Sequence, residues 1–181
     1  MTADDLGDEV LLNAEQIVDC LSRLADRLEA RAPAAPTTIV VAGGSCLALM
    51  GLRDTTADVD SVTALPPDLL DAAREVAEEM GIQETWLNAN ALPWKPDNLD
   101  VAACVDFLSR DSLRVVGLPP DALLLMKLNR SSEADQADMR RLWPLCTFAT
   151  VHEAALAFHD AYPTEDPDPF LADHLLQILE G

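Results

Sequence analysis

One short segment constrains the fold of this chain more than any other. Residues 37–42 read Thr-Thr-Ile-Val-Val-Ala, a β-branched and apolar run that is typical of a buried strand. Gly43 and Gly44 follow directly and break the strand, and Ser45 can then cap a short helix over residues 46–52. This order predicts a sheet whose first strand ends in a glycine turn with a helix beside it.

Further strands and helices alternate along the chain until helices dominate. We expect an amphipathic helix over residues 10–31, whose buried face carries Leu11, Ala14, Val18, Leu21, Ala25 and Leu28. Polarity and proline positions predict strands at 58–63 and 112–117, and helices at 66–80, 119–128, 133–145, 150–161 and 168–179. Residues 82–98 suggest a short strand or an irregular segment, and residues 99–110 are ambiguous. The pattern predicts an α/β (α+β) fold, a small mixed sheet flanked by helices with a helical C-terminal part.

The chain length suits one compact unit. At 181 residues it can bury a core without disulfides or structural metals. We expect an N-terminal helix packed on the core within residues 1–36, the sheet core within 37–118, and the helical C-terminal part within 119–181.

Charge narrows the classes of partner. The chain holds 32 acidic and 12 basic residues, a formal net charge of -20, which disfavours stable binding to duplex DNA or to anionic membranes. We find no apolar run of membrane-spanning length and no secretory signal. The four cysteines are widely spaced in apolar surroundings, which fits buried thiols in a reducing compartment. We therefore expect a cytoplasmic protein.

A first set of candidate site residues surrounds the glycine turn. Asp58 and Asp60 are two residues apart, so on a strand both side chains project from the same face. Two such carboxylates can ligate Mg²⁺, which also takes oxygens of a nucleotide. Gly43 and Gly44 let the backbone approach an anion closely, and Ser45 adds a hydroxyl donor. The alternative interpretation is an ordinary strand–helix turn followed by a surface strand with solvated acids.

A second set lies near residue 127. Lys127 stands inside the apolar run 123–128, where an ammonium needs a carboxylate or a bound phosphate as partner. Arg130 is placed to help. Two interpretations are compatible: Lys127 contacts phosphate, or it forms an ion pair with Asp135 or Asp138 that docks two helices.

Other polar residues carry less specific signals. Arg53 precedes the two aspartates together with Thr55 and Thr56, and these residues could contact phosphate or base, or simply lie in a loop. A third carboxylate would normally serve as general base or extra metal ligand, and the candidates are Asp100 and Asp106. The context of neither residue singles it out.

Four segments, in this order, resemble a known family. They are residues 40–60 (VVAGGSCLALMGLRDTTADVD), 84–88 (ETWLN), 118–130 (LPPDALLLMKLNR) and 132–142 (SEADQADMRRL). Together they are similar to segments of the minimal nucleotidyltransferases, in particular the AbiEii and MenT-like toxin group and related uncharacterised bacterial proteins. The likeness spans about residues 37–145. It departs from the family pattern at Asn129, where an alanine is common, and at Ala134, where an arginine precedes the aspartate.

The resemblance implies a nucleotidyltransferase fold and Mg²⁺-dependent transfer of a nucleotide from an NTP to an acceptor hydroxyl. In MenT-like members the acceptor is the 3′ end of tRNA, and toxins of this group are usually controlled by an antitoxin. It implies these roles: phosphate binding by Gly43, Gly44 and Ser45, metal binding by Asp58 and Asp60, triphosphate contact by Lys127, and support by Asp135 or Asp138. Because the third carboxylate is not secure, the alternative is a non-catalytic nucleotide- or partner-binding module with the same fold. A third interpretation is a toxin held by a basic partner on two acidic flanks, residues 1–22 and 151–181, which contain acids but no lysine or arginine.

Overall fold

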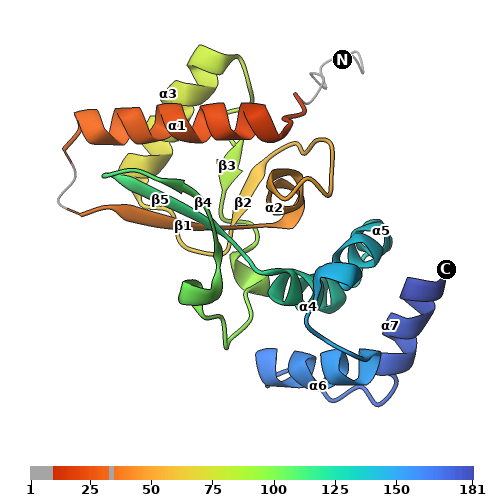
Figure 1. Ribbon diagram of the computed structural model, residues 1–181. Coiled ribbons are helices and arrows are strands. Elements are labelled where there is room, and N and C mark those ends of the chain that lie inside the picture. Colours follow the sequence, from red (N-terminus) through yellow and green to blue (C-terminus); the bar gives the residue numbers. More distant parts are fainter. Residues whose placement is uncertain (1–9, 33–34) are drawn as a thin grey trace, which may run out of the picture.

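A five-stranded mixed sheet forms the centre of the molecule. The computed structural model describes residues 10–32 and 35–181 (Figure 1). The strands are β1 (Thr37–Ala42), β2 (Val59–Ser61), β3 (Leu87–Asn88), β4 (Val105–Ser109) and β5 (Leu113–Gly117), and their spatial order is β3-β2-β1-β5-β4. β1 pairs parallel with β5 and antiparallel with β2, so the predicted buried strand lies at the middle of the sheet.

Helices flank this sheet and then continue alone. Within the described part of the chain they are α1 (Ala14–Ala30), α2 (Gly43–Leu49), α3 (Pro67–Met80), α4 (Pro120–Arg130), α5 (Glu133–Leu142), α6 (Val151–Ala161) and α7 (Leu171–Glu180). α1 and α3 pack side by side over the sheet, whereas α4 to α7 gather beyond its other side (Figure 1). The α/β class with a helical C-terminal part is therefore confirmed.

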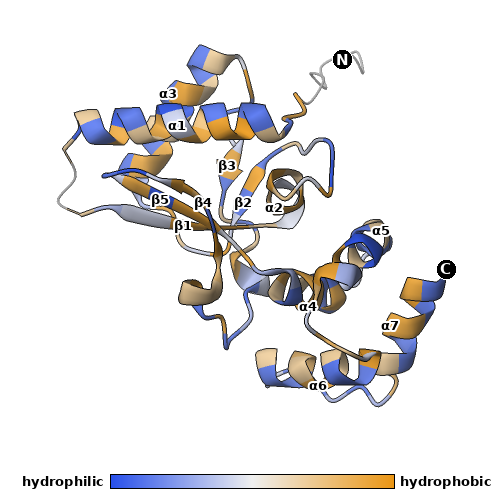
Figure 2. Cartoon of the chain, viewed as in Figure 1, coloured by the Kyte–Doolittle hydropathy of each residue, from blue (hydrophilic) through white to orange (hydrophobic). Residues whose placement is uncertain are grey.

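The central strands carry the apolar core. Ile39, Val40, Val41 and Ala42 of β1 are fully buried, and β5 is buried along most of its length. Apolar residues colour much of these strands, whereas polar and apolar residues alternate along α1 (Figure 2). The fully buried Trp86 closes the core beside α3, where its indole N–H donates to the Ala73 carbonyl at 2.9 Å.

Two local predictions need correction. α1 begins only at Ala14, because Asn13 and Gln16 form a capping box there. Its buried face is centred on residues such as Ile17 and Leu24, and Leu11 and Val18 are 53% and 41% exposed. Leu21, Ala25 and Leu28 of the expected face are buried as predicted, whereas Leu11 precedes the helix.

The helix after the glycine turn also starts earlier than expected. α2 begins at Gly43 with Ala42 in the capping position, so Ser45 lies inside the first turn rather than before it. The second strand is shorter than predicted, and Asp58 precedes it. The other predicted helices and strands appear within a few residues of their expected bounds.

Candidate functional site

The glycine turn and β2 meet closely. Gly43 adopts a φ of +63°, a left-handed conformation that glycine accepts readily. In the sheet Ala42 lies opposite Asp60, which brings the Asp60 side chain against the turn. A Cβ added at Gly43 would lie 3.1 Å from Asp60 Oδ2. The turn and this carboxylate therefore share one small space that any side chain at position 43 would crowd.

The loop between α2 and β2 folds back over the same turn. A Cβ at Gly44 would lie 2.8 Å from Thr56 Oγ1 and 2.9 Å from Arg53 Nη1. Thr56 is held in place by two backbone hydrogen bonds with Leu12, at 2.7 and 2.9 Å. The loop thus presses a guanidinium against the backbone of the turn.

Ser45 plays a local structural part. It is 1% exposed, and its hydroxyl donates to the Ala42 carbonyl at 3.0 Å. With its proton committed to that bond, the hydroxyl secures the turn and is not free to donate to a phosphate. The sequence predicted that the Ser45 hydroxyl would donate to a bound anion, whereas here it donates to the protein backbone.

Asp58 and Asp60 form an interacting pair. Asp60 lies in β2 opposite Asn88 of β3, and Asn88 Nδ2 donates to Asp58 Oδ2 at 3.0 Å. Burial raises the pKa of Asp60 to about 6, and the charge of Asp58 adds to this rise. The Asn88 amide and the positive charges of Arg130 and Lys127 oppose the rise. A cation bound between the two carboxylates would therefore stabilise the ionised form of Asp60.

Lys127 connects α4 to α5. Its Nζ donates to Asp135 Oδ1 at 2.8 Å and to Asp138 Oδ2 at 2.9 Å, and all three side chains are buried. The ion pair considered for this lysine is thus present, with both aspartates. Both carboxylates bind the Lys127 ammonium, so Lys127 can affect a bound phosphate only indirectly, through its charge and through the position of α5.

Arg130 completes this cluster. It donates from Nε and Nη2 to the two oxygens of Asp135, at 2.8 and 2.9 Å, and Ser132 donates to the same carboxylate. Burial acts to raise the pKa of Asp135, but hydrogen bonds from Arg130, Lys127 and Ser132 outweigh it and lower the pKa to about 2. Asp135 therefore stays ionised and keeps α4 and α5 locked.

Neither candidate for a third carboxylate joins the pair. Asp106 lies on β4, separated from β2 by β1 and β5, a distance of about 14 Å at the usual strand spacing. It pairs instead with Arg114 at 2.9 Å. Asp100 accepts from the Ala102 N–H and caps the short turn Val101–Ala103. Residues 10–32 and 35–181 contain no group of three His, Cys, Asp or Glu residues that could hold a metal ion.

Sequence reasoning assigned no role to Asn88 or Ser132, and it considered Thr56 only as a possible contact to phosphate or base. Asn88 stands where an acid on the neighbouring strand would meet Asp60, and it bonds to Asp58. The sequence feature that could have indicated Asn88 is its position in the segment 84–88, which carries part of the family resemblance. Thr56 and Ser132 also lie in segments that carry this resemblance, but their observed contacts depend on tertiary packing.

Comparisons with known proteins do not identify this site. Searches against protein-family models, curated proteins and solved structures found no significant match. Among the described residues, no helix is both long and apolar enough to cross a membrane.

Proposed function

We propose that this chain is a Mg²⁺-dependent nucleotidyltransferase that moves a nucleotide from an NTP to an acceptor hydroxyl. The observation that carries the proposal is the approach of Asp60 Oδ2 to the glycine turn, 3.1 Å from the Cβ position of Gly43, with Asp58 beside it. A backbone turn that excludes side chains could hold the phosphates, and a carboxylate pair could hold the metal, as such a reaction requires.

The donor set suits Mg²⁺. This ion is commonly bound by one or two carboxylates together with phosphate oxygens and water, and Asp58 and Asp60 supply two carboxylates. The missing Cβ at Gly43 leaves space beside Asp60 Oδ2, and a divalent cation would offset the burial that raises the pKa of Asp60. When bound, Mg²⁺ would align the triphosphate and neutralise charge on the leaving pyrophosphate.

The cations of this region would hold the phosphates. Arg53 lies against the turn and Arg130 is near enough to lower the pKa of Asp60, so both are placed to face the anion. Lys127 acts as a positioning residue, because its ammonium is bound by Asp135 and Asp138. The acceptor hydroxyl belongs to RNA such as tRNA, to a protein or to a small molecule. In a toxin role, the acidic surface would suit a basic antitoxin.

Labelled nucleotides test this function directly. The protein is incubated with Mg²⁺, total RNA and each of the four NTPs labelled at the α-phosphate. We expect label on an acceptor and release of pyrophosphate with at least one NTP. Asp58→Asn and Asp60→Asn should abolish both, whereas Asp106→Asn, an exposed acid across the sheet, should change neither. Persistent labelling by both site variants would overturn the assignment.

A second candidate function is a nucleotide-binding module that does not turn over. Asn88 lies opposite Asp60, at a position where an acidic residue could supply a third carboxylate ligand. The amide at this position favours the second candidate. It predicts NTP binding that depends on Asp60 and Mg²⁺ but no pyrophosphate release with any acceptor. Binding without release in the same assay would select it.

A further inference from the structure

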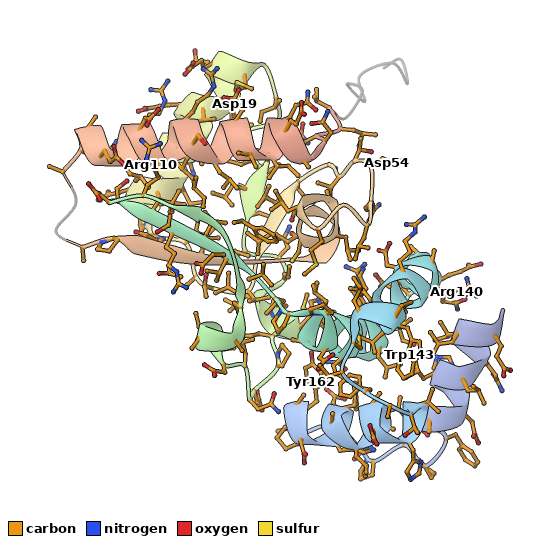
Figure 3. All side chains as sticks on the ribbon, in the orientation of Figure 1. Asp19, Asp54, Arg110, Arg140, Trp143 and Tyr162 are labelled. Atoms are coloured by element: carbon orange, nitrogen blue, oxygen red, sulfur yellow. The ribbon has the colours of Figure 1, made fainter. Side chains whose placement is uncertain are left out.

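A polar hollow lies next to the proposed nucleotide pocket. It has a volume of about 480 Å³ and is lined by Gly51, Leu52, Arg53, Asp54, Thr55 and Arg141. The loop that carries Asp54 faces α5, so the hollow lies between this loop and the helix (Figure 3). We call it the arginine hollow.

The two arginines that line it are the loosely paired ones. Every other arginine that pairs with a carboxylate in the described ranges has a contact of 3.1 Å or shorter. Arg53 comes no closer than 3.6 Å and Arg141 no closer than 3.4 Å. Both reach the same carboxylate, Asp138, which already accepts from Lys127 at 2.9 Å. One carboxylate cannot neutralise three cations.

The charge balance of this region is unusual for the chain. The lining of the hollow carries two guanidinium groups, those of Arg53 and Arg141, and one carboxylate, that of Asp54. A local surplus of positive charge stands out in a protein with a net charge of -20. The side chains of Arg53 and Arg141 are 44% and 52% exposed, so neither arginine is enclosed by its partners. Planar guanidinium groups of this kind match the oxygens of a phosphate.

We propose that the arginine hollow is a binding subsite for a phosphate group, held by Arg53 and Arg141. Arg141 is the new element, since it lies on α5 and outside the glycine turn. Arg53 links the two places, because its Nη1 also lies against Gly44. The phosphate belongs either to free pyrophosphate or to the tail of a bound nucleotide. Only the second source rests on the proposed function.

The test measures binding by isothermal titration at constant ionic strength. Inorganic pyrophosphate, AMP and ATP are titrated without Mg²⁺ into the wild-type chain, Arg53→Gln, Arg141→Gln and the double variant. The control Arg74→Gln removes one exposed arginine on α3, which pairs with Asp71. We expect the double variant to weaken binding of pyrophosphate or ATP by at least about tenfold, and the control to weaken it by less than about twofold. Circular dichroism confirms that each variant is folded.

The three ligands distinguish the sources. Pyrophosphate binding that depends on Arg141 identifies a free oxyanion site, and ATP binding that depends on Arg141 without pyrophosphate binding identifies the nucleotide tail. Equal affinity of the wild-type and the double variant for both ligands overturns the proposal, as does an absence of binding by both. Asp60→Asn separates this inference from the proposed function, because it should abolish transfer and leave pyrophosphate binding intact.

Discussion

At the scale of single residues, Gly43 combines a left-handed backbone with close approach of a carboxylate. Its φ of +63° and the 3.1 Å approach of Asp60 Oδ2 act together. Gly81 also has a positive φ, +66°, but no heavy atom lies within 4 Å of its Cβ position. Substitution of Gly81 therefore tests backbone strain alone, whereas substitution of Gly43 tests strain together with crowding of the pocket.

This comparison gives a first prediction. Gly81→Ala should cost about 1 kcal/mol of unfolding free energy, the ordinary penalty for a left-handed conformation. Gly43→Ala should cost about 2 kcal/mol and should also weaken Mg-ATP binding, because the new methyl group meets Asp60. Urea unfolding and titration calorimetry measure the two effects. Equal behaviour of the two variants would show that position 43 is a turn and nothing more.

Asp60 provides a second prediction, in which stability and activity move in opposite directions. The folded-state pKa of about 6 exceeds the ordinary value of 3.8, so the native state loses stability as the pH rises from about 4 to about 6. Asp60→Asn should therefore gain about 1 to 2 kcal/mol at pH 7.5 in EDTA, and should gain little at pH 4. Urea unfolding at both pH values measures the gain. A loss of stability at pH 7.5 would show that the carboxylate serves structure.

At the scale of elements, the contact of α4 with α5 depends on buried charge. Lys127→Met leaves Asp138 without its closest partner and Asp135 with only Arg130 and Ser132. Removal of one partner from a buried ion pair typically costs about 3 kcal/mol or more. We expect Lys127→Met to lose about that much stability in urea unfolding. Lys95, the other lysine of the chain, is exposed, so Lys95→Met should change the free energy of unfolding by no more than about 0.5 kcal/mol.

The same cluster predicts a response to acid. The pKa of Asp135 falls from 3.8 to about 2 on folding, so its stabilisation is complete above about pH 4 and disappears as the pH falls towards 2. This loss amounts to about 2 kcal/mol. Urea unfolding at pH 5 and pH 2.5 should show a smaller difference for Asp135→Asn than for the wild type. Asp71→Asn, at an exposed acid of α3, should retain the wild-type difference.

At the scale of the whole molecule, self-repulsion is the main electrostatic feature. The net charge of -20 raises the energy of the compact state. The exposed ion pairs between α1 and α3, such as Arg27 with Glu75 and Glu79, contribute little in comparison. An increase from about 20 mM to about 300 mM NaCl should therefore raise the Tm by a few degrees, since the added ions screen the repulsion. A Tm that falls with salt would show that the surface ion pairs outweigh it.

The fold could be predicted at this scale because local patterns are strong. The strand at 37–42 and the helix over 67–80 followed by Gly81 appear as expected, since β-branched runs, proline and glycine act through nearby residues. The buried face of α1 was predicted only in part: Leu21, Ala25 and Leu28 are buried as expected, whereas Leu11 precedes the helix that the capping box at Asn13 begins.

The candidate site was only partly predictable. Chemistry and spacing single out Asp58, Asp60 and Lys127, yet spacing cannot tell whether an ammonium meets phosphate or carboxylate. Only the docking of α4 on α5 decides that Lys127 lies between two aspartates. Asp106 illustrates the same point, because strand order places it across the sheet from β2.

By itself the sequence determined the class of fold, the glycine turn after the central strand and the acidic character of the chain, since these depend on residue type and on neighbours along the backbone. Tertiary structure alone decided that Asp60 meets Gly43, that Ser45 bonds inward and that Arg53 and Arg141 converge on one hollow. The physical reason is that such contacts join residues far apart in the chain, and their free energy depends on burial and distance, which no local pattern specifies.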